Sequence, residues 1–241
     1  KIQPIITEKL AIDGPFSADI GEEIFVSQNE DEIVLCLNYD GKFGLNNMNL
    51  YFQNANTKSQ VYTWAEWTFK VRDPVIFLDT KRSSLLYNNL KGRIVDISKR
   101  DSAILFTLDI DTILTERQCR NESFEFVDVT DLGTRIRLEV IANDDESAAE
   151  EERIKTIIPF QIAYAVSIHK AQGLEYNSVK IIIPSYNAEK ISHSIFYTAI
   201  TRAKEKLKIF WSAETMKAII ESFEKEKIGQ RTLEVIEKKL K

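Results

Sequence analysis

Two short segments of the chain carry polar and charged side chains at spacings suited to phosphate chemistry. In the first, Ser167, His169, Lys170, Gln172 and Glu175 fall within nine residues that follow a predicted apolar strand. Ligands of open parallel sheets bind at the carboxyl ends of the strands, so we expect these side chains at such an edge. A serine hydroxyl beside the free amides of a helix start can bind an oxyanion. The segment therefore predicts a site for phosphate groups.

The second segment is Phe196–Lys204, which has the spacing of a helix. Ser194, Thr198, Thr201 and Arg202 share the face of that helix opposite an apolar stripe. An arginine that packed neighbours hold on a rigid helix can meet a phosphate with its planar fork of donors. Arg202 is therefore the strongest single candidate for phosphate contact in the chain.

Ordinary structural roles stay open for the same residues. His169 alone is more often a satisfied structural histidine, and Arg202 alone is more often a surface cation paired with a carboxylate such as Glu205. Glu175 could begin the next turn, and Gln172 could end a short helix. The joint placement of His169 and Lys170 in a loop at a strand edge favours the functional interpretation.

The elements that position these segments have an alternating α/β order. Apolar runs predict buried parallel strands, and a serine cap at Ser192 or Ser194 predicts a helix to about Ala203. Strand, helix and strand in succession imply a right-handed crossover onto a parallel sheet. The predicted strands are Ile33–Leu37, Ile162–Val166, Val179–Ile183 and Leu207–Trp211, with a helix near Leu45–Phe52 and a terminal helix over residues 214–241.

The middle of the chain has a period of two instead. Short β-branched and aromatic runs separated by turn residues predict a small antiparallel β-barrel inserted into the α/β domain. The predicted strands are Trp67–Val71, Val75–Leu78, Arg93–Ile97, Ala103–Leu108, Phe124–Val129 and Thr134–Ile141. We expect the α/β domain in residues 1–64 and 157–213, the insertion in 65–156, and a terminal helix in 214–241.

Composition narrows the function classes. Only eight glycines occur among 241 residues, and none begins a G-x-x-x-x-G-K-[ST] or G-x-G-x-x-G pattern, so the chain has no recognisable phosphate loop of its own. Cys36 and Cys119 stand far apart, and with only two histidines the sequence suggests neither a disulfide framework nor a metal site. The chain opens Lys1-Ile2-Gln3-Pro4, without a leader pattern. We therefore expect a piece of a cytoplasmic protein with no membrane contact.

Charge is unevenly distributed along this acidic chain. The net charge is −5, yet residues 157–241 hold 14 basic against 9 acidic side chains, and residues 70–100 hold eight against three. A local basic strip fits a surface that binds a polyanion, and Arg82 and Arg93 are its candidate contacts. The alternative is that the strip is only a solvated face.

Two pairs of residues have weaker interpretations. Trp64 and Trp67 could stack on nucleobases, but core packing is at least as common a role for tryptophan. The pair Asp31-Glu32 precedes its apolar run, whereas the acidic pair that holds Mg²⁺ in nucleotide hydrolases ends its strand. We therefore exclude Asp31-Glu32 as a magnesium site.

Both polar segments resemble motifs V and VI of superfamily 1 helicases, in the RecD-like branch. Residues 31–49, with Val34-Leu35-Cys36-Leu37-Asn38-Tyr39, are similar to the motif IV strand and helix. Residues 69–76 and 87–94 resemble the start of the small barrel inserted before motif V, although that run usually has glycine where Arg72 stands. The fold implied is a RecA-like parallel-sheet domain that lacks its own phosphate loop and is interrupted by a small antiparallel β-barrel.

The resemblance implies roles for individual residues. Arg202 would reach the γ-phosphate of ATP, and Gln172, Gly173 and Glu175 would lie beside the nucleotide. Ser167, His169, Lys170 and Asn38 would contact the backbone of the nucleic acid or couple the two sites. ATP with Mg²⁺ would be shared with an N-terminal RecA-like domain that supplies the phosphate loop.

The function implied is the C-terminal half of an ATP-dependent DNA helicase or translocase, an ATP hydrolase that acts on single-stranded DNA. The isolated chain is then expected to hydrolyse no ATP. Two alternatives stay open at this point: a non-catalytic nucleic-acid-binding or regulatory module with a helicase-derived fold, and a helicase acting on RNA, because backbone contacts carry no sugar preference.

Overall fold

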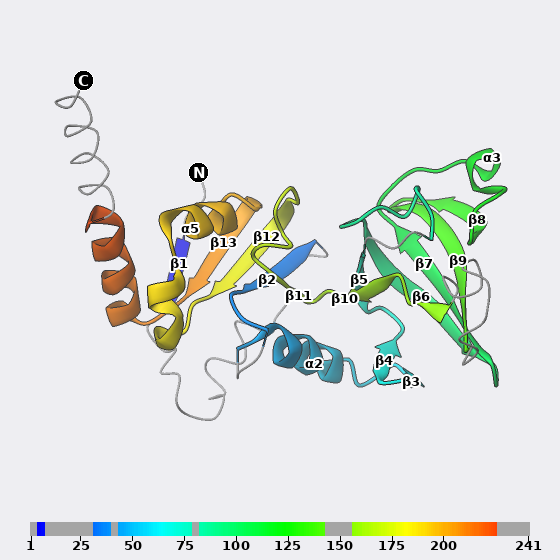
Figure 1. Ribbon diagram of the computed structural model, residues 1–241, viewed down its shortest axis with the longest axis horizontal. Helices are drawn as coiled ribbons and strands as arrows, with labels where there is room; N and C mark the ends of the chain where they lie inside the picture. The colour runs from blue at the N-terminus through cyan, green and yellow to red at the C-terminus, as the bar shows by residue number, and fades with distance from the viewer. Residues whose placement is uncertain (1–3, 8–30, 40–42, 79–81, 143–155, 226–241) are drawn as a thin grey trace, which may run out of the picture. The chain divides into compact units, whose positions relative to one another are not determined.

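The computed structural model of the protein describes residues 4–7, 31–39, 43–78, 82–142 and 156–225 (Figure 1). They belong to two compact units: residues 1–48 with 165–241, called the parallel-sheet unit below, and residues 49–164, called the inserted unit. The turn at residues 40–42, the acidic run 144–152 and residues 226–241 of the predicted terminal helix lie outside the described residues.

The parallel-sheet unit contains a five-stranded sheet of order β1-β13-β12-β2-β11. All four neighbouring pairs are parallel. Each of the central strands β13, β12 and β2 pairs with a strand at both of its edges, and its buried residues are mostly apolar, as is typical of a parallel sheet. The strands are β1 (Pro4–Thr7), β2 (Glu32–Cys36), β11 (Ala165–Ser167), β12 (Tyr176–Ile182) and β13 (Ala203–Phe210).

Helix α5 (His193–Ile200) packs against β12 and β13 of this sheet. Of the two serines predicted as caps, Ser192 is the N-cap of α5. Its hydroxyl accepts a hydrogen bond from the main-chain N–H of Ile195 at 3.3 Å. A short 3-10 helix η1 (Ser185–Lys190) precedes it. A helix over residues 213–225 lies against α5, because Phe223 approaches the ring of His193 with centroids 5.3 Å apart.

The inserted unit is a six-stranded antiparallel sheet of order β10-β5-β6-β7-β9-β8, with the separate hairpin β3–β4. Its core is a cluster of aromatic and aliphatic side chains to which Phe69, Phe77, Phe106 and Phe160 contribute edge-to-face ring contacts. Bulges in β6 and β8 interrupt the ladder registers. The strands are β3 (Val61–Trp64), β4 (Trp67–Lys70), β5 (Pro74–Phe77), β6 (Lys91–Lys99), β7 (Ala103–Ile110), β8 (Glu125–Thr130), β9 (Gly133–Ile141) and β10 (Phe160–Ile162).

Two helices complete the description. Helix α2 (Leu45–Ala55) follows β2, as the spacing of its apolar residues predicts, and its last turns belong to the inserted unit. A single turn, α3 (Glu116–Cys119), begins at Thr115 with reciprocal hydrogen bonds between Thr115 and Gln118. Within the described part of the chain, no helix is both long and apolar enough to cross a membrane.

One predicted strand is wrong as a continuous element. The sequence predicts a strand over Ile162–Val166, but the chain breaks at Ala163–Tyr164 into two strands. Strand β10 pairs antiparallel with β5 in the inserted unit, and β11 pairs parallel with β2 in the other unit. Because the two strands follow different partners, the chain leaves one unit and enters the other inside a single apolar run.

The compact inserted unit is longer than the predicted insertion. It covers residues 49–164, and the insertion predicted over residues 65–156 lies within it. Pairing explains the difference, because β3 is the hydrogen-bonded partner of β4 and Phe160 of β10 lies in the core of the inserted unit.

Candidate functional site

Ser167 and Asn38 lie at the carboxyl edge of the parallel sheet. Ser167 ends β11 and stands opposite Cys36, the last residue of β2, so Asn38 follows two residues beyond the same edge. The main-chain N–H of Ile168 donates to the carbonyl of Cys36 at 3.1 Å. Asn38 and Ser167, both expected to contact a nucleic-acid backbone, therefore lie at the same edge of the sheet.

Ser167 also begins the turn that follows β11. Its side-chain oxygen accepts a hydrogen bond from the main-chain N–H of Lys170 at 3.2 Å, and its carbonyl accepts one from Ala171 at 3.0 Å. This is the capping arrangement expected of a serine at a helix start. The hydrogen bond from Lys170 fixes the hydroxyl of Ser167 in the turn, and the Ser167 side chain is largely buried.

His169 and Lys170 sit in that turn with different exposure. His169 is exposed, and Lys170 is half-buried. Burial lowers the pKa of the Lys170 amino group from its ordinary value. A partly desolvated cation interacts more strongly with a nearby anion than a fully hydrated one does. Lys170 is therefore the better placed of the two for a charge contact with a phosphate.

The chain then crosses to the opposite edge of the sheet. Gly173 adopts φ of +86°, and no atom lies within 4 Å of the position that a Cβ would take there. The positive φ turns the chain toward the amino end of β12, where Glu175 directly precedes Tyr176. The exposed Gln172 precedes this turn. The sequence prediction that all five polar residues share one carboxyl edge is wrong for Glu175, because β12 starts at the other edge.

Arg202 lies at this amino edge, in the residue before β13. Its Nε donates to the carbonyl of Thr198 at 2.9 Å and its Nη1 donates to the carbonyl of Leu174 at 2.9 Å. Its Nη2 donates to the hydroxyl of Thr201 at 3.0 Å. All three acceptors are neutral oxygens, so the positive charge of the half-buried guanidinium is not neutralised by these contacts.

The fork of Arg202 retains donor capacity. A guanidinium has five N–H donors, and three are engaged, which leaves two without a partner among the described residues. The main chain of Arg202 is fixed as well, because its carbonyl accepts a hydrogen bond from Tyr176 at 2.9 Å. The end of α5, the Gly173 turn and the start of β12 therefore hold one arginine in a defined orientation.

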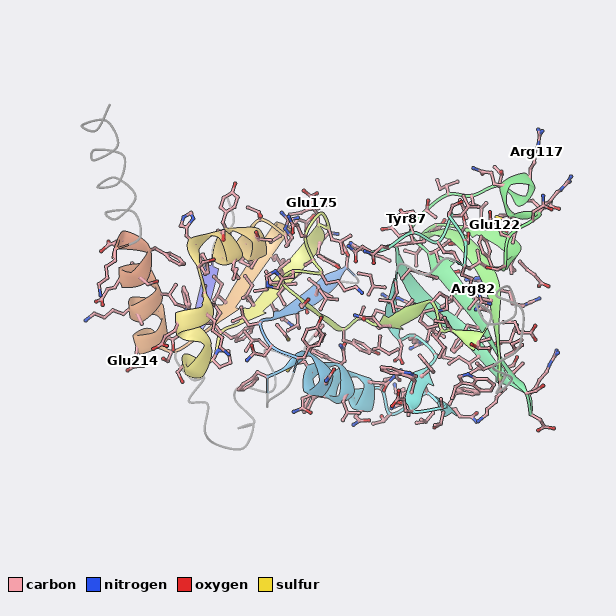
Figure 2. All side chains as sticks on the ribbon, in the orientation of Figure 1. Arg82, Tyr87, Arg117, Glu122, Glu175 and Glu214 are labelled. Carbon is pink, nitrogen blue, oxygen red and sulfur yellow. The ribbon has the colours of Figure 1, made fainter. Side chains whose placement is uncertain are left out.

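Glu175 is exposed beside this arginine. Figure 2 labels it at the edge where β12 and β13 begin, and its carboxylate lies 3.8 Å from the amino group of Lys204. An exposed pair at this distance contributes little to stability. One edge of the sheet therefore carries Gly173, Glu175 and Arg202. The other edge carries Ser167, Lys170 and Asn38.

The acidic pair next to β2 has a structural role. The Glu32 carboxylate lies 2.6 Å from the amino group of Lys180, which is fully buried, and it accepts a hydrogen bond from the Ser178 hydroxyl at 2.7 Å. Asp31 accepts a hydrogen bond from the main-chain N–H of Asn177 at 3.1 Å. Among the described residues no group of three or more potential metal-ligating side chains occurs.

The basic strip of the inserted unit is not one exposed surface. Arg82 is only 6% exposed, and its guanidinium donates to the carbonyls of Ile157 and Glu139. Burial lowers the pKa of Arg82 to about 10. The expectation that Arg82 contacts a nucleic acid is therefore corrected, because its fork joins two segments of the unit. Arg93 is half-buried, so its assignment as a contact stays a prediction.

The anchoring contacts of Arg202 were not predicted from the sequence. They use the main-chain oxygens of Leu174 and Thr198, which any residue type supplies. The only local signal is the spacing of four between Thr198 and Arg202, which places an arginine beside the carbonyl of the preceding helical turn.

Comparison with known protein families gives a match for the segment that carries most of the residues at the two edges of the sheet. Residues 162–209 match the model of the UvrD-like helicase C-terminal domain, so the match spans Ser167, Gly173 and Arg202. The RecD subunit of the RecBCD enzyme from Buchnera aphidicola subspecies Acyrthosiphon pisum is 21% identical over 205 residues, which is 80% of this chain and 28% of that protein.

Parts of the chain are also similar in sequence to other RecD helicases. A second RecD subunit, from Buchnera aphidicola subspecies Schizaphis graminum, is 30% identical over 103 residues, which is 42% of this chain and 17% of that protein. The ATP-dependent RecD2 DNA helicase of Deinococcus radiodurans is 29% identical over 86 residues, covering 36% and 11%. The chain thus spans less than a third of the length of each of these three relatives.

Pif1 helicases are among the solved structures that align with the chain. The Candida albicans Pif1 helicase aligns with a TM-score of 0.44 and 14% identity, covering 84% of this chain and 52% of that chain. A Bacteroides Pif1 bound to single-stranded DNA aligns with a TM-score of 0.41 and 15% identity, covering 80% and 45%.

Proposed function

We propose that this chain is the C-terminal motor half of an ATP-dependent DNA helicase or translocase, inactive as an ATPase by itself. The observation that carries the proposal is the position of Arg202, whose guanidinium is anchored at 2.9 Å to Leu174 and Thr198 and keeps two donors for a further acceptor. In this proposal the acceptor is the γ-phosphate of an ATP bound mainly by an N-terminal RecA-like domain.

The residues present fit one side of a nucleotide. Arg202 offers a charged fork, and the open space at Gly173 lets a ligand approach the main chain closely. The sequence has no phosphate loop, so the magnesium ion and the other phosphate contacts would come from the N-terminal domain. Bound ATP supplies the phosphoryl group that water attacks, and charge spreads over its γ-oxygens in that reaction.

The opposite edge of the sheet is assigned to the DNA backbone. The hydroxyl of Ser167, the amino group of Lys170, and the side chains of His169 and Asn38 are polar groups of the kind that contact phosphates without reading sequence. Only the short segment 167–175 separates this edge from Glu175 and Arg202. A contact with ATP or DNA at either end would therefore act on the same short segment. ATP hydrolysis would be coupled to movement along DNA if the open and closed states of the two domains bind ATP and DNA with different affinities.

The test uses a protein that contains this chain together with a RecA-like domain carrying a phosphate loop. Arg202→Ala is expected to lower the DNA-stimulated ATPase rate by about 10³- to 10⁵-fold, the range for an arginine that stabilises the transferring phosphoryl group. Arg117→Ala is the matched control, because Arg117 is exposed on α3 (Figure 2). An Arg202→Ala protein with normal stimulated ATPase activity would show that the assigned role is wrong.

The chain without that domain is expected to hydrolyse no ATP. Turnover that persists through purification, and that Arg202→Ala abolishes, would contradict the proposed division of the site. The same preparations distinguish the non-catalytic alternative, since a binding module would retain its affinity for DNA in a protein with no stimulated ATPase.

A further inference from the structure

A tryptophan stands exposed at the tip of the β3–β4 hairpin. Trp67 is 57% exposed, and it pairs across the hairpin with Trp64 at the last position before the two-residue turn Ala65-Glu66. A tryptophan ring offers a large flat apolar face on which a nucleobase can stack. The position of Trp67 at a tip makes its ring accessible to a ligand.

The hairpin that carries Trp67 is firmly attached to the inserted unit. Phe69 of β4 lies in the core, with its ring centroid 5.1 Å from that of Phe106. Thr68 exchanges two hydrogen bonds with Gln53, its hydroxyl donating at 3.1 Å and its carbonyl accepting at 2.9 Å. A ring on a fixed support loses little conformational entropy when it binds a ligand.

Lys99, the last residue of β6, contacts the hairpin. The amino group of Lys99 lies 5.8 Å from the centroid of the Trp64 ring and donates to the carbonyl of Thr63 at 2.8 Å. The contact places the tip of the β6–β7 connection, with the exposed Arg100, beside the hairpin. Lys99 and Arg100 are exposed near the tip, with the exposed acids Glu66 and Asp101, whereas the exposed Lys58 and Arg72 flank the base of the hairpin in sequence.

We propose that the β3–β4 tip is a stacking site for a base of single-stranded nucleic acid, with Trp67 as its platform and Lys99 and Arg100 as contacts for the adjoining phosphates. An aromatic ring beside cations is the combination that single strands recognise, because every base has a face to stack and every nucleotide a charge. The proposal rests on the proposed function and adds a site that lies apart from motifs V and VI in the sequence.

The test measures binding of the 241-residue chain to two fluorescent probes, a dodecamer of thymidylate and an abasic deoxyribose-phosphate oligomer of the same length. Trp67→Ala is expected to weaken binding of the thymidylate probe by about 5- to 100-fold, which corresponds to one stacked base, and to leave the abasic probe within about twofold. Trp67→Phe should restore most of the affinity.

Two further variants separate stacking from charge and from general damage. Tyr87→Ala is the control, because Tyr87 is 52% exposed in the same unit (Figure 2) and should bind as wild type. Lys99→Ala should weaken both probes and lower the slope of log affinity against log salt by about 0.7. Circular dichroism checks that each variant is folded.

The outcomes are distinct. If wild type binds thymidylate and Trp67→Ala binds equally well, the stacking site is wrong while the proposed function stands, and the exposed ring is then assigned to a protein contact. Equal weakening of both probes by Trp67→Ala also refutes stacking. If wild type binds neither probe, the DNA part of the proposed function fails and the hairpin site fails with it.

Discussion

Asp73 is the most informative residue to perturb in the inserted unit. Its side chain is fully buried, and one carboxylate oxygen accepts hydrogen bonds from Gln53 Nε2 at 2.6 Å and from the main-chain N–H of Lys70 at 2.8 Å. The other oxygen accepts one from the hydroxyl of Tyr164 at 2.9 Å. Burial raises the pKa of Asp73 above its ordinary value, and these hydrogen bonds oppose that rise.

The cost of removing the carboxylate follows from the three donors it satisfies. Asp73→Ala leaves them without their acceptor, and each buried donor left unsatisfied costs about 1 to 3 kcal/mol. We therefore expect the free energy of unfolding to fall by roughly 3 kcal/mol or more. Asp73→Asn keeps a carbonyl oxygen for Gln53 and Lys70 and can donate to Tyr164, so its cost should be nearer 1 kcal/mol.

The sign of the pH dependence follows from the raised pKa. Folding favours the protonated form, so the contribution of Asp73 to stability is fully present below its ordinary pKa and is lost as the pH rises through the raised value in the folded protein. The stability of wild type relative to Asp73→Asn should therefore fall as the pH increases across that interval.

Urea unfolding measures these differences. Trp64 and Trp67 report on the inserted unit by fluorescence, and Trp211 reports on the other, so Trp211→Phe isolates the transition of interest. The reasoning is refuted if Asp73→Ala costs less than about 1 kcal/mol, the least expected for even one unsatisfied buried donor. Equal costs for Ala and Asn, or a pH dependence of the opposite sign, would also refute it.

Three further outcomes are expected from other parts of the molecule. Lys180→Met should lower the free energy of unfolding by about 3 to 5 kcal/mol in urea titrations because it leaves the buried Glu32 carboxylate without its cation, whereas Lys180→Met with Glu32→Leu should recover most of the loss. Gly133→Ala should destabilise the inserted unit by roughly 2 kcal/mol or more in thermal unfolding, since its φ is +132° and a Cβ would lie 2.2 Å from a main-chain oxygen. Burial raises the pKa of the Cys36 thiol to about 12, so a thiol reagent at pH 8 should label Cys36 only after urea is added, and rapid labelling of the folded chain would contradict this.

Local pattern was enough to predict most strands and not enough to predict their partners. The run Ile33–Leu37 matches β2 within one residue, because a short apolar run between polar turns has few other solutions. The break at Ala163–Tyr164 has no such local signal. It arises because β5 and β2, which are far away in sequence, each pair with one half of the same apolar run.

The candidate site was predicted in its residues more fully than in its layout. The two motifs identified Ser167, Gly173 and Arg202, but their distribution over two edges of the sheet depends on where each strand begins and ends. Ser167 ends β11, whereas Gly173 lies just before β12, which begins at Tyr176, three residues earlier than predicted. Counting charges along the sequence led to a wrong prediction for Arg82. A basic residue in a basic strip can still be buried when main-chain carbonyl oxygens accept the hydrogen bonds of its guanidinium.

The ring of Phe52 stacks on that of Tyr164, with centroids 5.6 Å apart and planes within 12°. These two residues stand near the first and last positions of the inserted unit, so the unit begins and ends at one place. A module with adjacent termini can be exchanged, enlarged or removed by recombination while a short linker closes the host chain. Proteins descended from one ancestor could in this way come to differ in the inserted unit without any change in the five strands of the parallel sheet.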